Sequence, residues 1–232
     1  MYSPMKKVKL NFKSLGKVAF PSLSPQNINI NMMPFVIGDS KSLIPEHRKY
    51  WSIISACKPE LDQMGKIGYL SINESFVPKG TTQRRPGIHT DRESNSIKSA
   101  WGGAWGGGWG GGRDNNGELI GGIYMASNVA NTCRLWDTCI KNPKHLGNCS
   151  HLESELEQYP KYVMDENELI WFTDSCPHES MPMTESAYRQ WIRFVTKDVS
   201  VWYTEHSSPN PLGIKPSQDC EIITKSKFET VK

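Results

Sequence analysis

Residues 168–178 have the sequence ELIWFTDSCPH and place a candidate ligand directly after a candidate strand. The first six of these residues are mostly large apolar side chains, which are typical of a buried strand. The turn residues Ser175 and Pro177 end the strand, so His178 follows its carboxyl end. This stretch predicts a β-rich fold with a histidine at the edge of a buried strand.

Further short strands are predicted on both sides of this stretch. Segments rich in aromatic and β-branched residues lie between turn residues, at 67–72, 119–129, 132–136, 162–164 and 190–203. Residues 42–64 instead predict a helix, because apolar side chains recur three or four residues apart until Pro59 interrupts them. A short helix is expected around 152–158. The pattern predicts a mainly β (α+β) protein, a β-sandwich or jelly roll with helices packed outside.

Length and composition indicate one globular protein. The chain has 232 residues, 37% hydrophobic and 22% charged, which fits a soluble protein with an ordinary core. The net charge of +3 does not indicate nucleic-acid binding. No apolar run approaches the roughly 20 residues needed to cross a bilayer, and the N-terminus has no apolar signal segment. We therefore expect a cytoplasmic or other intracellular protein whose six cysteines are thiols.

We divide this single domain, residues 1–232, into three segments. An N-terminal arm with helices covers 1–65, a jelly-roll core covers 66–205, and a C-terminal extension covers 206–232. The core carries an insert at 101–112, WGGAWGGGWGGG, which repeats one tetrapeptide pattern three times. Glycine loses much conformational entropy on ordering, so the insert predicts a loop.

Three side chains have the types and spacing of a metal site. His89 and Asp91 are two residues apart, so on an extended segment they point to the same face. His178 is the third candidate. Two imidazoles and one carboxylate on one face of Fe(II) leave the opposite face open for other ligands. The residues therefore predict a metal centre that keeps vacant coordination positions.

Two arginines follow the last histidine on a predicted strand. Arg189 and Arg193 are four residues apart, so they share one face of that strand. A guanidinium is always charged and pairs bidentately with a carboxylate. The sequence therefore predicts an arginine that holds a carboxylate near the metal centre.

The order of these residues resembles the Fe(II)/2-oxoglutarate-dependent dioxygenase superfamily over residues 67–203. The shared features are H-x-D at His89 and Asp91, a long gap, a strand, Pro177-His178 and the following arginines. The resemblance implies a double-stranded β-helix, with Fe(II) on His89, Asp91 and His178. It places the co-substrate 2-oxoglutarate on Arg189, with Arg193 as a second arginine. It further implies an O2-using hydroxylase of a C–H bond that releases succinate and CO2. The sequence is compatible with a small-molecule or peptide substrate and also with a nucleobase.

Other residues are weaker candidates for contacts in the same site. Asn128 and Tyr124 on a predicted strand are candidates for the co-substrate, and Arg85 and Arg134 for the substrate. These polar groups are also consistent with satisfied core residues. The indoles of the insert either stack on a substrate as a mobile lid or pack on the outer sheet; they belong to Trp101, Trp105 and Trp109.

Two other functions remain open from the residues alone. One is a non-catalytic jelly-roll binding or structural protein, and the other is a cupin-like metalloenzyme that uses no 2-oxo acid. In the second case Arg189 would be dispensable and the histidines would not. A small zinc site is a further alternative, although its spacing fits no familiar zinc finger; its residues would be Cys139, His145, Cys149 and His151.

Overall fold

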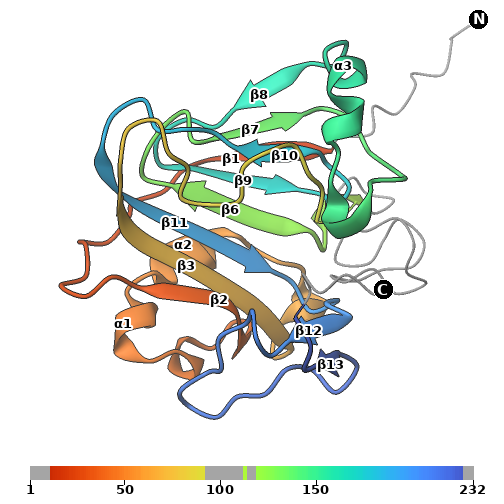
Figure 1. Cartoon of the computed structure of the whole chain (residues 1–232). Helices are drawn as coiled ribbons and strands as arrows, with labels where there is room; N and C mark the ends of the chain where they lie inside the picture. The colour runs from red at the N-terminus through yellow and green to blue at the C-terminus, as the bar shows by residue number, and fades with distance from the viewer. Residues whose placement is uncertain (1–10, 92–111, 114–118, 227–232) are drawn as a thin grey trace, which may run out of the picture.

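The computed structural model describes residues 11–91, 112–113 and 119–226, and it is mainly β (Figure 1). A six-stranded antiparallel sheet dominates. Its strands, in spatial order, are β1 (Phe12–Lys17), β9 (Glu168–Phe172), β6 (Ile123–Ser127), β11 (Ala187–Val195), β3 (Ile67–Val77) and β2 (Asn29–Val36). The prediction of a mainly β protein with a few helices is confirmed.

A smaller antiparallel sheet packs against the large one. It contains β10 (His178–Ser180), β7 (Cys133–Trp136) and β8 (Lys161–Val163). One hydrophobic cluster joins Met125 and Phe172 of the large sheet to Cys133 and Leu135 of the small sheet. The two sheets are therefore the layers of a sandwich with a shared interior.

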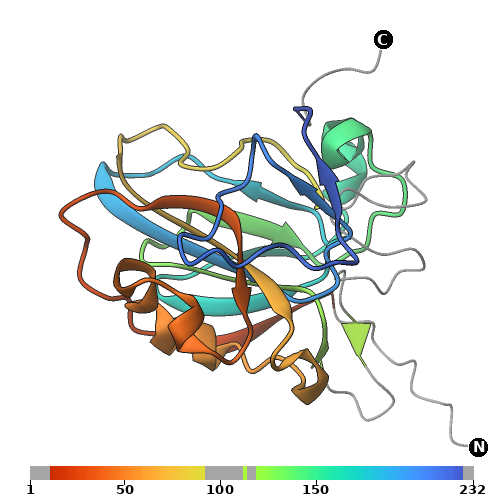
Figure 2. The ribbon, with the colours of Figure 1, turned by 90° about the horizontal axis from the view of Figure 1, so that it is seen from below.

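Short helices cover the other face of the large sheet. Helices α1 (Pro45–Arg48) and α2 (Trp51–Ala56) lie along that side in Figure 2. Ile53 and Ile54 pack there in a second cluster with Ile192 and Phe194 of β11. Because successive side chains of a strand point to opposite faces, Trp191 and Val195 of the same strand enter the sandwich interior.

The prediction of one helix over 42–64 is wrong in its continuity. The region contains α1 and α2 with single 3-10 turns on either side, η1 (Ser40–Ser42) and η2 (Leu61–Gln63). Pro45 starts α1, where its missing N–H removes no helical hydrogen bond. Lys58 has a positive φ of 49° and precedes Pro59, so the chain cannot continue as a helix beyond α2.

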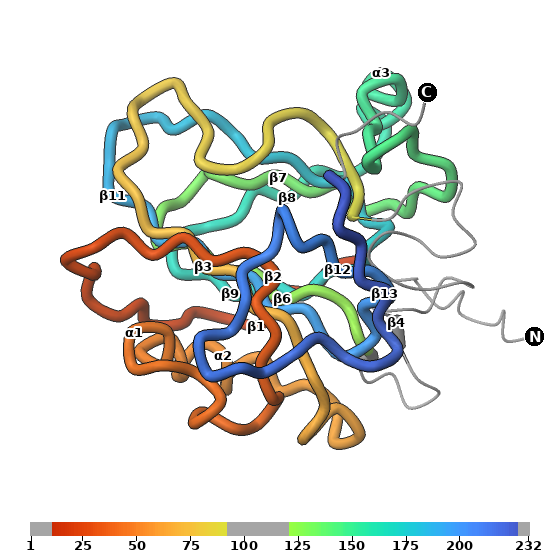
Figure 3. The backbone as a smooth tube through the Cα atoms, turned by 60° about the horizontal axis from the view of Figure 1, so that its bottom comes forward, coloured from red at the N-terminus to blue at the C-terminus, as the bar shows by residue number. Residues whose placement is uncertain are grey.

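The strand predicted over 190–203 is two strands, β11 and β12 (Val201–Tyr203). Strand β12 pairs in parallel with β13 (Glu221–Ile223). Between them the chain runs along β2, as Figure 3 shows, and Asn210 Nδ2 donates to the carbonyl oxygen of Pro34.

The remaining short elements are β4 (Gly112–Arg113), β5 (Leu119–Ile120), η3 (His145–Gly147), η4 (Ser150–Leu152) and α3 (Glu153–Leu156). The last of these agrees with the short helix expected near residue 152.

A buried carboxylate ties the helices to the large sheet. Glu74 of β3 is 1% exposed and accepts hydrogen bonds from Tyr50 Oη at 2.7 Å and from the backbone N–H of Ser24 at 2.9 Å. Lys49 Nζ lies 2.6 Å from the same carboxylate. Burial alone would raise the pKa of Glu74, but these donors outweigh burial and lower the pKa to about 2.

We expect Glu74→Gln to lower the free energy of unfolding at pH 7 by about 1–3 kcal/mol, because a buried charge-assisted network is lost. The lowered pKa means that this contribution is complete above the ordinary value of 4.5 and disappears as the pH falls toward 2. Urea unfolding at several pH values measures it. The control is Glu185→Gln, which removes an exposed carboxylate paired with Lys79. An equal effect of both substitutions at pH 7 contradicts the account.

Candidate functional site

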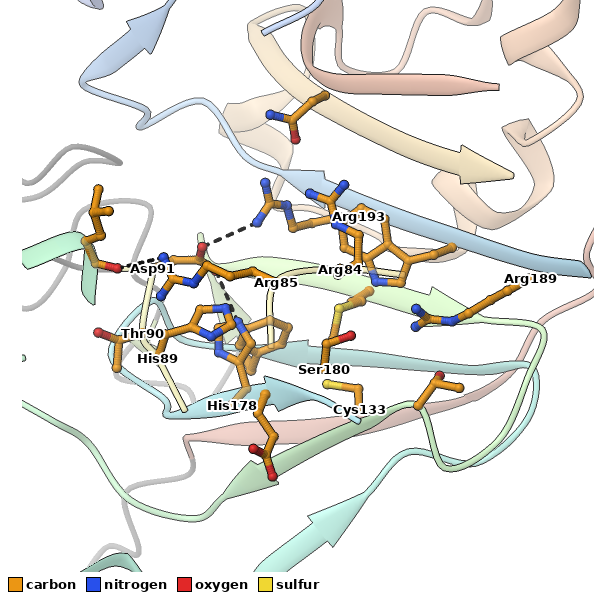
Figure 4. Close-up of a pocket in the computed structure, with 17 residues that line it drawn as sticks. Arg84, Arg85, His89, Thr90, Asp91, Cys133, His178, Ser180, Arg189 and Arg193 are labelled. Atoms are coloured by element: carbon orange, nitrogen blue, oxygen red, sulfur yellow. Dashed lines mark hydrogen bonds and ion pairs between the residues drawn. The ribbon is translucent and has the colours of Figure 1, made fainter. Parts of the chain in front are cut away.

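A cavity of about 120 Å³ opens into the sandwich interior (Figure 4). Its wall combines three parts of the chain that are distant in sequence. The large sheet contributes Met125, Phe172, Arg189, Trp191 and Arg193; the small sheet contributes Cys133, His178, Glu179 and Ser180; the segment 84–91 contributes Arg84, Arg85, His89, Thr90 and Asp91. The cavity therefore contains the metal-ligand candidates and both predicted arginines.

The backbone holds His89 beside His178. The N–H of each residue donates to the carbonyl oxygen of the other at 2.9 Å, and the two ring centroids lie 4.4 Å apart. The backbone N–H of Asp91 donates to the carbonyl oxygen of Asp174 at 3.0 Å. His178 Nε2 then lies 3.7 Å from Asp91 Oδ2. Two donors that each bind one ion at about 2.1 Å are at most about 4.2 Å apart, so this separation is compatible with a shared ion.

Both imidazoles leave Nε2 available toward the cavity. His89 Nδ1 lies 2.7 Å from the carbonyl oxygen of Gly87, and His178 Nδ1 lies 3.0 Å from that of Cys176. A carbonyl only accepts, so Nδ1 carries the proton in each ring and Nε2 has the lone pair. Burial lowers the pKa of both histidines, and His178 lowers that of His89 further. The rings are therefore in the neutral tautomer that binds metal ions.

The Asp91 carboxylate is ionised and incompletely hydrogen-bonded. Burial alone would raise its pKa, but Arg193 and the two histidines outweigh burial and hold the pKa below its usual range. Arg193 Nη1 lies 3.3 Å from Oδ1, whereas the buried Oδ2 has no hydrogen-bond partner. An orphaned carboxylate oxygen beside a neutral imidazole fits a cation. No three His, Cys, Asp or Glu side chains in the described ranges form a ready-made metal cage.

Arg189 is a buried cation for which the described residues supply no counter-ion. Its side chain is 1% exposed, and its Nε donates to Ser127 Oγ at 3.0 Å. Within the described part of the chain, no carboxylate forms an ion pair with this guanidinium. Burial lowers its pKa to about 10, so it stays protonated at neutral pH. A buried, unpaired guanidinium is strongly unfavourable unless an anion joins it.

Two further wall residues were not predicted from the sequence. Ser180 lies two residues after His178 on β10, so the two side chains share a face of the strand, and the buried Oγ of Ser180 has no hydrogen-bond partner. The two-residue spacing of Ser180 from His178 is a sequence signal that could have identified Ser180. Arg84 lies 4.4 Å from the ring centroid of Trp191, over which Arg193 also lies, at 5.6 Å. No local pattern in the sequence marks Arg84 as a site residue.

The weaker predictions have mixed outcomes. Arg85 lines the cavity, where its Nη1 donates to the carbonyl oxygen of Leu146 at 3.0 Å. Arg134 lies behind the wall and pairs with Glu179. Asn128 Oδ1 accepts from the backbone N–H of Gln190 at 2.7 Å, at the end of β6 and away from the cavity wall.

Tyr124 points away from the cavity, contrary to the prediction. It stacks on Phe194 at 5.6 Å in the cluster beneath the helices. Its neighbour Met125 faces the cavity, because adjacent residues of a strand point to opposite faces. The strand was correctly predicted, and its register was misjudged by one residue.

The remaining predictions concern the insert and the zinc alternative. The indoles of the insert lie outside the described residues; they are Trp101, Trp105 and Trp109. The structure does not gather the proposed zinc ligands, since no metal-holding group occurs in the described ranges. Cys149 instead packs in a small hydrophobic cluster with Ile88 and Trp136.

Comparison with known proteins gives no family. No family model matches the chain, and no curated protein matches it. Across the residues that the structure describes, no helix has the length and hydropathy required to traverse a bilayer.

The two arginines of β11 should affect stability in opposite directions. We expect Arg193→Met to lower the free energy of unfolding by about 3–5 kcal/mol, because the buried Asp91 carboxylate loses its cation. Arg189→Met should leave the free energy of unfolding unchanged or raise it, because it removes a buried charge that has no partner. Chemical unfolding of both ligand-free variants measures the difference. A large loss of stability in Arg189→Met would show that its charge is compensated.

Proposed function

We propose that the chain is an Fe(II)- and 2-oxoglutarate-dependent oxygenase that hydroxylates a C–H bond of a small-molecule or peptide substrate. One observation carries the proposal. The uncompensated guanidinium of Arg189 shares a cavity with the free Nε2 atoms of His89 and His178 and with the Asp91 carboxylate. An anion-binding group and an open set of metal donors are the two requirements of this chemistry.

The donor set fits Fe(II). Neutral imidazoles and one carboxylate suit this ion, and three protein donors leave coordination positions for other ligands. His89, Asp91 and His178 would hold the ion, and the carbonyl oxygens of Gly87 and Cys176 would orient the rings. Bound Fe(II), together with 2-oxoglutarate and O2, would supply C–H oxidation with release of succinate and CO2.

The opposite end of the cavity fits the distal carboxylate of 2-oxoglutarate. In Figure 4, Arg189 lies at one end of the drawn site, and the two histidines and Asp91 lie at the other. Ser127 orients Arg189 through Nε, which leaves the Nη groups for a bidentate contact with a carboxylate. The unpartnered Ser180 Oγ is a neutral donor on the same wall. Arg189 would bind the co-substrate and Ser180 would help to orient it.

We further infer that the fold is a double-stranded β-helix. From β3 onward the chain alternates between the sheets. After β3 of the large sheet, His89 bridges to His178 of the small sheet, and the chain then returns to the large sheet in β6. It continues to β7 and β8 of the small sheet, β9 of the large sheet, β10 of the small sheet and β11 of the large sheet. This connectivity supports a jelly roll whose open end holds the cavity.

The two alternative functions explain less of the site. A cupin-like metalloenzyme without a 2-oxo acid would have no use for the buried Arg189 cation. A non-catalytic binding protein would need neither the free Nε2 atoms nor the orphaned Asp91 oxygen. The oxygenase accounts for all of these groups together.

Binding of 2-oxoglutarate tests the proposal. Under anaerobic conditions, addition of Fe(II) and 2-oxoglutarate should produce a weak visible charge-transfer band, and His178→Ala should abolish it. Arg189→Gln should weaken 2-oxoglutarate binding by about 2–4 kcal/mol, measured by calorimetry on the Mn(II)-loaded protein, because a buried charge pair is lost.

The matched control is Lys66→Gln, which removes one positive charge from an exposed position. It should bind 2-oxoglutarate as the unchanged chain does. A folded, iron-loaded protein that gives no band and no succinate release contradicts the proposal. A band with unchanged binding in Arg189→Gln contradicts the role given to Arg189.

A further inference from the structure

Arg84 is a second cation of the cavity without a counter-ion. Its guanidinium lies over the ring of Trp191, and it forms no hydrogen bond or ion pair with any residue in the described ranges. Burial lowers its pKa, with Arg193 and Arg189 as further causes, to about 10. Arg84 therefore stays charged at neutral pH and is held against the aromatic ring in a fixed orientation.

The guanidinium groups of the cavity differ in whether they have a carboxylate partner. Four arginines line the wall, Arg84, Arg85, Arg189 and Arg193. Arg193 faces Asp91, and Arg134 neutralises Glu179, the other carboxylate of the wall. For Arg84 and Arg189 the described residues provide no carboxylate. Under the proposed function, 2-oxoglutarate would neutralise Arg189, so Arg84 would still attract an anion.

The co-substrate does not account for Arg84. One carboxylate of 2-oxoglutarate is assigned to Arg189 and the other, with the 2-oxo group, to the metal. Figure 4 draws Arg84 beside Arg193 and apart from the Arg189 end of the site. The planar fork of a guanidinium matches the two oxygens of a carboxylate or phosphate. The site therefore has a place for one more oxyanion near the reacting centre.

We propose that Arg84 binds an oxyanion of the substrate, so the substrate is an organic acid or phosphate ester. The inference rests on the proposed function for the identity of the second ligand. Trp191 would orient the guanidinium, and Arg193 would add to the local positive potential.

The experiment uses two probes, acetate and methyl phosphate, which represent the two sources of an oxyanion. Ligand-detected NMR measures their affinity for the full chain, first without metal and then loaded with Mn(II) and saturating 2-oxoglutarate. We expect binding in the loaded state, with Arg84→Gln about tenfold weaker or more, as loss of a charge-assisted hydrogen bond predicts. The probe that binds more tightly identifies the carboxylate or phosphate class.

Control variants separate this role from general charge and from folding. Lys66→Gln removes a charge from an exposed position and should leave probe affinity unchanged. Arg84→Lys keeps the charge but loses the planar fork, so it should lie between Arg84→Gln and the unchanged chain. The melting temperature of ligand-free Arg84→Gln should not fall, because the substituted residue has no polar partner in the described ranges.

The outcomes distinguish the inference from the function on which it rests. Probe binding that is unaffected by Arg84→Gln in a protein that binds Mn(II) and 2-oxoglutarate overturns the inference and leaves the function standing. Arg84-dependent probe binding in a protein that does not bind 2-oxoglutarate overturns the function and keeps an oxyanion site. Loss of 2-oxoglutarate binding in Arg84→Gln, with normal binding in Arg189→Gln, overturns both assignments.

Discussion

Burial of like charges inside a β-sandwich is the constraint on which this structure depends. Arg189 is 1% exposed and has one neutral hydrogen-bond partner, Ser127. Arg84 and Arg193 lie in the same cavity, over one tryptophan ring. Such an arrangement lowers the stability of the empty protein, since buried guanidinium groups repel one another and are poorly solvated. Asp91 offsets the charge of Arg193, and under the proposed function the anions of the co-substrate and the substrate would offset those of Arg189 and Arg84.

The fold supplies this arrangement through the two-residue period of its strands. In β11, Arg189, Trp191 and Arg193 face the cavity, while Gln190 and Ile192 face the helices. The small sheet repeats the principle, because His178 and Ser180 share one face of β10. Backbone pairing of His89 with His178 then brings the segment with His89 and Asp91 against β10. The cavity residues of the two sheets are thus on paired strands, which hold side chains more rigidly than loops do, whereas Arg84, Arg85 and Asp91 come from an irregular segment.

Many strand positions and the three metal-ligand candidates could be picked out from the sequence because they depend on local patterns. The run at 168–173 and the spacing of His89 and Asp91 each have a short-range signature. The sequence does not tell whether Tyr124 faces the cavity or the helices. Both faces of its strand are covered by apolar side chains, and an aromatic residue suits either face. The predicted helix does not extend through residues 42–64. The apolar side chains keep a helical spacing, but the positive φ of Lys58, just before Pro59, ends the helical conformation.

Arg84 could not be identified as a site residue because its role depends on contacts across the fold, whereas the two-residue strand period from His178 could have placed Ser180 in the site. The stacking of Arg84 on Trp191 joins positions that only the tertiary structure brings together. The orphaned Ser180 Oγ becomes visible only when its surroundings are known. The features that suggest substrate chemistry are therefore long-range ones, whereas the features that suggest a metal are local.

A crystal structure of the protein grown anaerobically with Mn(II) and 2-oxoglutarate tests the central claim most directly. The account predicts an anomalous difference peak for Mn(II) within bonding distance of Nε2 of His89, Nε2 of His178 and the Asp91 carboxylate. It also predicts a carboxylate of 2-oxoglutarate in a bidentate contact with Arg189. A metal bound elsewhere, or an Arg189 guanidinium that remains without an anion in the loaded crystal, would contradict it.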